Sequence, residues 1–169
     1  RPGRNGTGIS MLATELTAKR LELLKQVLPQ ARRILYLRNP SNPLGERMFG
    51  EARNAAQTLS VRLDAIDARN GAELDGALKV IRRSRADAFL VSEDLVFASD
   101  SAMDKITRLA REAKLPAVYP WYFYHVHGAL MSYGSEHKQL YRLTEVYVDK
   151  ILKGDKPADL PVEQISKYD

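Results

Sequence analysis

The chain has 169 residues, of which 44% are hydrophobic and 28% are charged, and it contains no cysteine. This composition excludes a disordered or fibrous protein, and the length allows one well-formed core with an appendage. The lack of cysteine excludes disulfides, thiolate metal sites and a cysteine nucleophile. The formal net charge of +5 raises the question of nucleic-acid binding, but the basic residues are dispersed and the densest groups end predicted helices, where cations oppose the helix dipole. We therefore expect no nucleic-acid partner.

The first part of the chain alternates helix patterns with short apolar strands. A helix is predicted from about Thr14 to Leu28, followed by a buried strand at Ile34–Leu37. After the turn-rich Asn39–Pro43, a second helix leads to the strand Val61–Asp67, which alternates apolar and polar residues and is expected at a sheet edge. The apolar stripe of the second helix comprises Met48, Ala52, Ala55, Ala56 and Leu59.

Two more helix and strand pairs follow. A third helix leads to the strand Ala88–Val91, and a fourth helix, with Ser99 or Ser101 as its N-cap, leads to the strand Ala117–Tyr119. Strands separated by single helices pair in parallel through right-handed crossovers. The sequence therefore predicts an α/β fold, a doubly wound and mostly parallel sheet in three α/β/α layers.

The last 40 residues or so have a different pattern. Ala129–Gly134 is predicted as another short strand, followed by a helix from Glu136 to Lys153 that Gly154 ends. A linker and a last short strand at Val162–Ile165 complete the chain.

Ligands bind outside the carboxyl ends of the strands in doubly wound sheets, so the loops that follow the strands are the candidate sites. In the first loop, the amides of Asn39 and Asn42 offer donors and acceptors to a ligand, or form a rigid turn that caps the next helix. In the second, the carboxylates of Glu93 and Asp94 accept a ligand ammonium or hydroxyl, or cap the helix near Ser99. The sequence leaves both alternatives open.

The third loop begins with the segment 119–124, in which five of six residues are aromatic. Flat aromatic side chains give contact surface at a low entropic cost. Core packing accounts for about two of these rings, and we expect the others to form a binding surface.

Catalytic and metal-binding signatures are absent from the sequence. It contains no phosphate-binding loop and no nucleophile elbow, and the segment Gly3–Gly8 lacks the preceding strand that a dinucleotide site needs. Of His125, His127 and His137, the first two are spaced i, i+2, and no carboxylate lies near enough in sequence to complete a plausible ligand set for a metal. We expect no metal, no cofactor and no enzymatic activity.

Several motifs together make the whole chain resemble the ABC-transporter substrate-binding proteins of the tryptophan/tyrosine-receptor type, a branch of the type I periplasmic-binding-protein fold. Each motif is weak alone. The motifs are Arg1-Pro2-Gly3 with Asn5, Thr7 and Gly8, then Lys19 to Lys25, Asn39-Pro40 with Asn42-Pro43, Leu130 to Gly134, and Tyr147 to Gly154 with Pro157 to Gln164.

The resemblance implies two lobes that close on a ligand. It makes residues 1–10 an interlobe crossover, 11–133 the second lobe and 134–169 a return segment that packs on an absent first lobe. The chain starts without Met, which suggests a piece of a longer protein. The resemblance implies a leader upstream, a periplasmic or membrane-anchored extracytoplasmic location, and a membrane permease as partner. In the isolated fragment, the uncovered helix 136–153 is expected to drive self-association.

The resemblance implies that the chain is part of an ABC importer that binds a small solute, and we expect an amino acid, with an aromatic one as a candidate. Glu93-Asp94-Leu95 replaces a Pro-Asp-Pro type loop of the family, and Tyr122-Phe123 replaces a more polar pair, so the ligand's identity does not carry over. A ligand-sensing regulatory domain of the same fold is the main alternative, and an enzyme on a flavodoxin-like sheet is the third. The candidate ligand-binding residues are Asn39, Asn42, Glu93, Asp94, Tyr119, Trp121 and Tyr133.

Overall fold

The computed structural model describes residues 5–168 and divides into two compact units. Unit 2 is Ala13–Gly134, and unit 1 consists of the described parts of residues 1–12 and 135–169. No helix among the described residues is long and apolar enough to span a membrane.

Unit 2 contains a four-stranded sheet in which every pair of neighbouring strands is parallel. Its strands are β2 (Arg33–Arg38), β3 (Arg62–Asp67), β4 (Ala88–Val91) and β5 (Ala117–Val118). Their order across the sheet is β3-β2-β4-β5, which confirms the predicted parallel sheet and the predicted edge position of β3.

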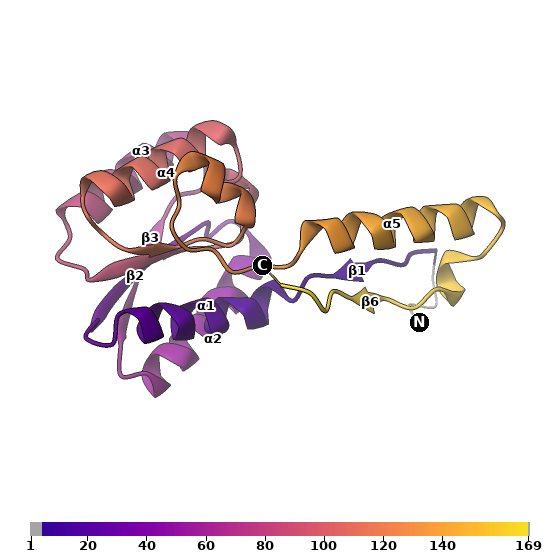
Figure 1. Cartoon of the computed structure of the whole chain (residues 1–169), viewed down its shortest axis with the longest axis horizontal. Coiled ribbons are helices and arrows are strands. Elements are labelled where there is room, and N and C mark those ends of the chain that lie inside the picture. The colour runs from indigo at the N-terminus through magenta and orange to yellow at the C-terminus, as the bar shows by residue number, and fades with distance from the viewer. Residues whose placement is uncertain (1–4, 169) are drawn as a thin grey trace. The chain divides into compact units, whose positions relative to one another are not determined.

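Helices cover both faces of this sheet, with α1 and α2 on one face and α3 and α4 on the other (Figure 1). The bounds are α1 (Ala13–Val27), α2 (Pro43–Thr58), α3 (Gly71–Arg83) and α4 (Asp100–Glu112). Because strand side chains alternate between faces, the strands contribute side chains to two separate cores. The core under α1 and α2 contains Ile34, Tyr36, Ala88, Leu90 and Val118, and the core under α3 and α4 contains Leu35, Leu37, Phe89 and Val91.

Polar side chains fix the starts of three of these helices. Asn42 caps α2, Asn70 caps α3 and Ser99 caps α4, each by accepting a hydrogen bond from a backbone N–H of the first turn. Of the two serines predicted as the cap of α4, Ser99 is therefore the one used.

The predicted strand at 129–134 is wrong. In the described part of the chain, this segment forms only an isolated bridge, between Tyr119 and Ser132. The physical reason is that β5 ends at Val118, so the segment pairs only with Tyr119, the residue that follows, and Leu130 is 95% exposed instead of packing on the sheet.

Unit 1 pairs a two-stranded parallel sheet with one helix. Strand β1 (Ile9–Ser10) pairs with β6 (Glu163–Gln164), and α5 (His137–Leu152) runs alongside them (Figure 1). Only Tyr147 of α5 is buried, with its hydroxyl donating to the carbonyl of Pro161 at 2.7 Å. Three short 3-10 helices complete the structure, η1 (Leu95–Phe97) and η2 (Tyr122–His127) in unit 2 and η3 (Pro157–Asp159) in unit 1.

Candidate functional site

The order of the strands creates a switch point between β2 and β4. The chain leaves β2 through α2 on one face of the sheet and leaves β4 toward α4 on the opposite face. The loops that follow these two neighbouring strands therefore diverge at the carboxyl edge and leave a place for a ligand between them. These are the loops that contain Asn39, Asn42 and Asp94.

Asn39, Asn42 and Asp94 meet at this switch point. The amide nitrogen Nδ2 of Asn42 donates to Oδ2 of Asp94 at 2.8 Å, and that of Asn39 donates to Oδ1 of Asp94 at 3.2 Å. We call these three residues the amide–carboxylate cluster. It joins residues more than 50 positions apart in the sequence, and Asp94 is 7% exposed.

Each member of the cluster also holds its own loop. The side-chain oxygens of Asn39, Asn42 and Asp94 accept backbone N–H groups two residues further on, at 2.9, 3.0 and 2.9 Å. The first loop therefore caps α2, which was one of the two alternatives that the sequence left open. Its amide nitrogens still point at the carboxylate of Asp94. Asp94 caps η1 and leaves the cap of α4 to Ser99. Each Nδ2 keeps a second proton and Asp94 keeps further lone pairs for a ligand.

Glu93 has a different environment from its neighbour Asp94. It forms an ion pair at 2.9 Å with Nη2 of Arg20 on α1, and the two side chains are 8% and 1% exposed. Arg20 also donates from Nε to the carbonyl of Tyr133 at 2.6 Å and from Nη2 to that of Pro120 at 3.4 Å. This network, which we call the Arg20 anchor, ties the ends of β4 and β5 to the last residues of unit 2.

Arg20 was not predicted from the sequence. Its spacing of four from both Leu16 and Leu24 was the available signal, because it places a charge on an apolar helix stripe. Such a charge is buried only when it is paired.

Two polar atoms at the anchor are buried and have no hydrogen-bond partner among the described residues, Nη1 of Arg20 and Oγ of Ser92. The buried hydroxyl of Tyr36 has Thr17 as a side-chain hydrogen-bond partner. Tyr36 lies on the sheet face that α1 covers, and the alternation of β4 places Ser92 on the same face as Leu90. Burial raises the pKa of Tyr36 to about 12, with the charge of Arg20 opposing the shift. Most polar groups at the rim of the site therefore have hydrogen-bond partners, whereas some buried polar atoms in its interior have none.

The aromatic segment packs mainly into the core under α3 and α4. Tyr119, Trp121 and Tyr124 are 2%, 7% and 0% exposed, and the rings of Tyr119 and Tyr124 stack with centroids 4.6 Å apart. Phe123 packs against the same core and stacks on Trp121, so the expectation that core packing uses about two rings is too low. The reason is that η2 repeats every three residues, which turns Trp121 and Tyr124 to one side.

Tyr133 is connected to its neighbours by backbone hydrogen bonds. Its carbonyl accepts from Arg20 and its N–H donates to the carbonyl of Tyr119 at 3.1 Å. Of the seven candidate residues, the structure brings Asn39, Asn42 and Asp94 into direct contact, links Glu93 and the Tyr133 backbone through Arg20, and buries Tyr119 and Trp121.

The histidines have other partners. Nδ1 of His127 lies 2.6 Å from Asp104, and Nδ1 of His125 lies 3.1 Å from the carbonyl of Ala129. Among residues 5–168 there is no group of three or more histidine, cysteine or acidic side chains able to hold a metal ion. The glycine-rich segment 3–8 lies partly outside the described residues.

Comparison with known proteins gives a family match over the whole chain. The model of the ABC transporter substrate binding protein family matches residues 1–169. No curated protein matches the sequence.

Solved structures show the same fold. A conserved domain protein from Vibrio cholerae is 27% identical with a TM-score of 0.88, and the match covers 99% of this chain and 55% of that one. The ABC domain from Streptococcus pneumonia in complex with L-Trp is 25% identical with a TM-score of 0.85, over 99% of this chain and 57% of that one. This chain thus spans little more than half the length of these proteins.

A more distant structure shows likeness of fold alone. It is a periplasmic binding protein/LacI transcriptional regulator from Alkaliphilus metalliredigens, complexed with D-xylulofuranose, which is 15% identical with a TM-score of 0.70 over 95% of this chain and 62% of that one. The parallel sheet, the switch point at its carboxyl edge and the match over the full sequence agree: the chain belongs to the family of ABC transporter substrate-binding proteins.

Proposed function

We propose that this chain supplies the second lobe and the return segment of the solute-binding component of a bacterial ABC importer. The observation that carries the proposal is the amide–carboxylate cluster at the switch point, where polar groups from two separate loops converge with hydrogen-bonding capacity to spare. The intact protein closes two lobes on a small solute and delivers it to a membrane permease outside the cytoplasm. It binds its solute without chemical turnover.

The proposed solute is an amino acid, and an aromatic one is the first candidate. Asp94 accepts the ammonium group, while the second protons of the Asn39 and Asn42 amides reach the carboxylate or a hydroxyl. Tyr133 covers the flat part of the solute, and the buried rings of Trp121 and Tyr119 support it from the core. The L-Trp complex of the Streptococcus protein supports this choice.

In this proposal Glu93 contacts Arg20 and not the solute. A buried carboxylate that is already paired at 2.9 Å gains little from a second cation, and releasing it would leave Arg20 unpaired in a dry environment. Glu93 therefore fixes the loop from which Asp94 projects.

Titration calorimetry of the full-length protein tests the proposal, with a panel of L-amino acids led by L-tryptophan and L-tyrosine. We expect one of them to bind with a 1:1 stoichiometry and a negative heat-capacity change, because closure buries apolar surface. A panel without any binding would reject an amino acid as the solute.

A ligand-sensing regulatory domain is the second candidate, favoured by the LacI-type regulators among proteins of this fold. This role and import require the same lobe and the same cluster, and they differ in what the rest of the protein contains. A DNA-binding or kinase segment in the full-length protein would decide for regulation.

We also propose that α5 drives self-association of the isolated fragment. Its exposed apolar side chains offer unburied surface, and light scattering after gel filtration tests the idea. A monomer at all concentrations would contradict it. These side chains are Tyr141, Val146, Val148, Ile151 and Leu152.

A further inference from the structure

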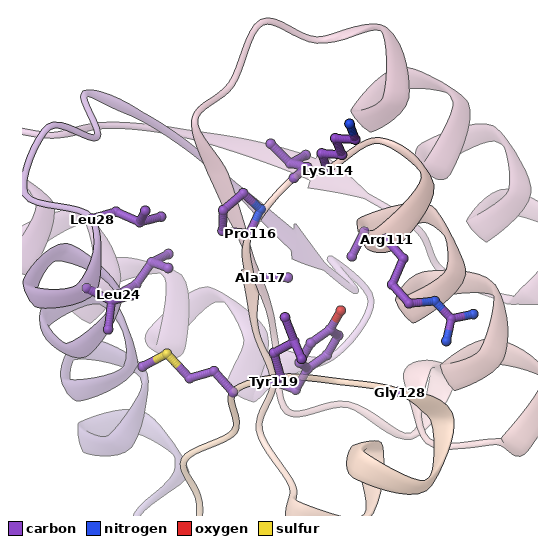
Figure 2. A pocket seen from close by; sticks show the side chains of 13 residues that line it. Leu24, Leu28, Arg111, Lys114, Pro116, Ala117, Tyr119 and Gly128 are labelled. Carbon is purple, nitrogen blue, oxygen red and sulfur yellow. The ribbon is translucent and has the colours of Figure 1, made fainter.

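A groove of about 490 Å³ runs along the outer edge of β5, within unit 2 (Figure 2). Leu24 of α1 and Leu28, which follows the helix, line one side, Pro116 and Ala117 form the floor, and Arg111 lines the opposite side. None of the residues of the amide–carboxylate cluster or the Arg20 anchor lines it. The groove therefore shares the buried Tyr119 with the proposed solute site, but it contains none of that site's polar groups.

The floor of the groove is an open strand edge. The N–H of Tyr119 donates to Met131 at 3.2 Å and its carbonyl accepts from Tyr133 at 3.1 Å, so both point away from β4. The backbone groups of a strand alternate in direction, which turns the N–H and carbonyl of Ala117 outward as well. No hydrogen bond within residues 5–168 reaches either group.

The side chains around this edge are apolar or basic. The lining contains two cations, Arg111 and Lys114, and no acidic residue. Neither cation forms an ion pair with any residue that the structure describes. At its margins, Val27 is 64% exposed and Leu130 is 95% exposed. The groove thus combines free backbone groups, apolar walls and unmatched positive charge.

We propose that this groove binds an extended polypeptide segment that contains alternating apolar and acidic residues and adds to β5 as a further strand. Strand addition satisfies the donor and the acceptor of Ala117, as in other cases of peptide recognition at a sheet edge. Successive side chains of the segment point to opposite faces, so one set meets Leu24 and Leu28 and the other meets Arg111. A partner protein supplies the segment.

Other occupants fit the groove less well. An apolar acid of low molecular weight fits the walls and the charges, but its alkyl chain leaves the N–H and carbonyl of Ala117 without partners, which is costly away from water. A second copy of the chain would need an exposed acidic strand. The edge strand β3 carries Asp64 and Asp67, but both already form ion pairs with arginines, and β1 and β6 are two residues long and pair with each other.

Backbone amide exchange of the full-length protein tests this proposal, with two acetylated and amidated tetrapeptides as probes, Leu-Glu-Leu-Glu and the matched Leu-Lys-Leu-Lys. We expect the acidic peptide to slow exchange of the Ala117 N–H at least about tenfold at saturation and the basic peptide to leave it unchanged. The double variant Arg111→Glu/Lys114→Glu should lose the effect, whereas Lys79→Glu, which changes a cation outside the groove, should keep it.

Circular dichroism checks that the double variant is folded, and Lys114→Gln alone should weaken peptide binding by a few fold if it is not. Three results overturn the proposal: protection of Ala117 by both peptides alike, protection by decanoate but by neither peptide, or protection that depends only on protein concentration. The second result would indicate a site for apolar acids and the third a contact between copies of the chain.

Discussion

Two neighbouring carboxylates, those of Glu93 and Asp94, work in opposite ways at the end of β4. Glu93 turns inward to a guanidinium that is 1% exposed, whereas Asp94 lies at the switch point between two side-chain amides. The first arrangement pairs two opposite charges away from solvent. The second pairs one charge with neutral amide donors, which keep further protons for other hydrogen bonds.

The comparison separates anchoring from recognition. A substitution in an ion pair without solvent access is costly, since removing either partner leaves the other charge buried and unpaired. A carboxylate held by amides can exchange or share partners with a ligand at a lower cost. We therefore expect changes in the Arg20 anchor to appear as lost stability, and changes in the amide–carboxylate cluster to appear as lost affinity.

Removing the positive charge gives the largest expected effect on stability. Arg20→Met leaves Glu93 buried and unpaired, and should lower the free energy of unfolding by about 3–5 kcal/mol. The matched control is Lys19→Met, since Lys19 forms an exposed pair with Glu22 that contributes about 0–1 kcal/mol. Urea denaturation measures both. Equal losses in the two variants would show that the anchor is not special.

Gly134 tests how tightly the chain is held where unit 2 ends. A Cβ added there would lie 1.9 Å from the carbonyl oxygen of Pro120, so Gly134→Ala should cost about 3 kcal/mol through displaced backbone. Gly50, within α2, has nothing within 4 Å of its added Cβ, and Gly50→Ala should stabilise by about 1 kcal/mol. Thermal unfolding of both variants separates a steric effect from a general effect of alanine.

The hydroxyl of Tyr36 tests the interior beside the anchor at high pH. Burial raises the pKa of Tyr36 from 10.0 to about 12, so the folded state keeps this proton while the unfolded chain releases it, and stability is lost as the pH rises from about 10 to 12. Tyr36→Phe should reduce that loss, with the remainder due to Tyr119 and Tyr124, whose pKa values burial also raises, and should change stability at pH 7 by at most about 1 kcal/mol. Unfolding measured from pH 9 to 12 checks this, and an unchanged profile would contradict it.

The smallest effect is expected at Asp87, an exposed carboxylate that directly precedes β4, at the amino ends of the strands. The N–H groups of Arg32 and Arg33 each donate to it at 2.8 Å, which lowers its pKa. A lowered pKa gives stability above the ordinary aspartate value that is lost as the pH falls below it. Asp87→Asn should therefore reduce the acid dependence below pH 4, by less than about 1 kcal/mol because of solvent screening. A variant as acid-sensitive as the wild type would refute this.

The sequence predicted the fold well because the periodicity of unit 2 is strong. The stripe of α2 and the buried run at β4 appear where expected, since local pattern and tertiary burial agree there. The segment 129–134 failed because its apolar residues fit a strand locally, while its pairing depends on a partner only two residues long.

The candidate site was predicted in part. Asn39, Asn42 and Asp94 were found because they follow strands directly, and strand ends of a parallel sheet meet at one edge. The pairing of Glu93 with Arg20 was not found, because it joins residues 73 positions apart; the apolar helix stripe marks Arg20 as buried but does not identify its partner. The sequence analysis assigned too few aromatic rings to the core and too many to a binding surface, because composition does not reveal which side chains of a 3-10 helix face the core.

Calorimetry on two matched variants tests most directly whether Asp94 recognises the solute while Glu93 anchors the fold. It uses the full-length protein and the amino acid from the panel that binds. Asp94→Asn and Glu93→Gln each replace a carboxylate by an amide of the same shape at adjacent positions. We predict that Asp94→Asn weakens binding at least about tenfold, which is about 1.4 kcal/mol, and that Glu93→Gln changes the Kd less than about threefold while lowering the temperature of unfolding. A loss of affinity in Glu93→Gln that equals or exceeds the loss in Asp94→Asn would contradict the account.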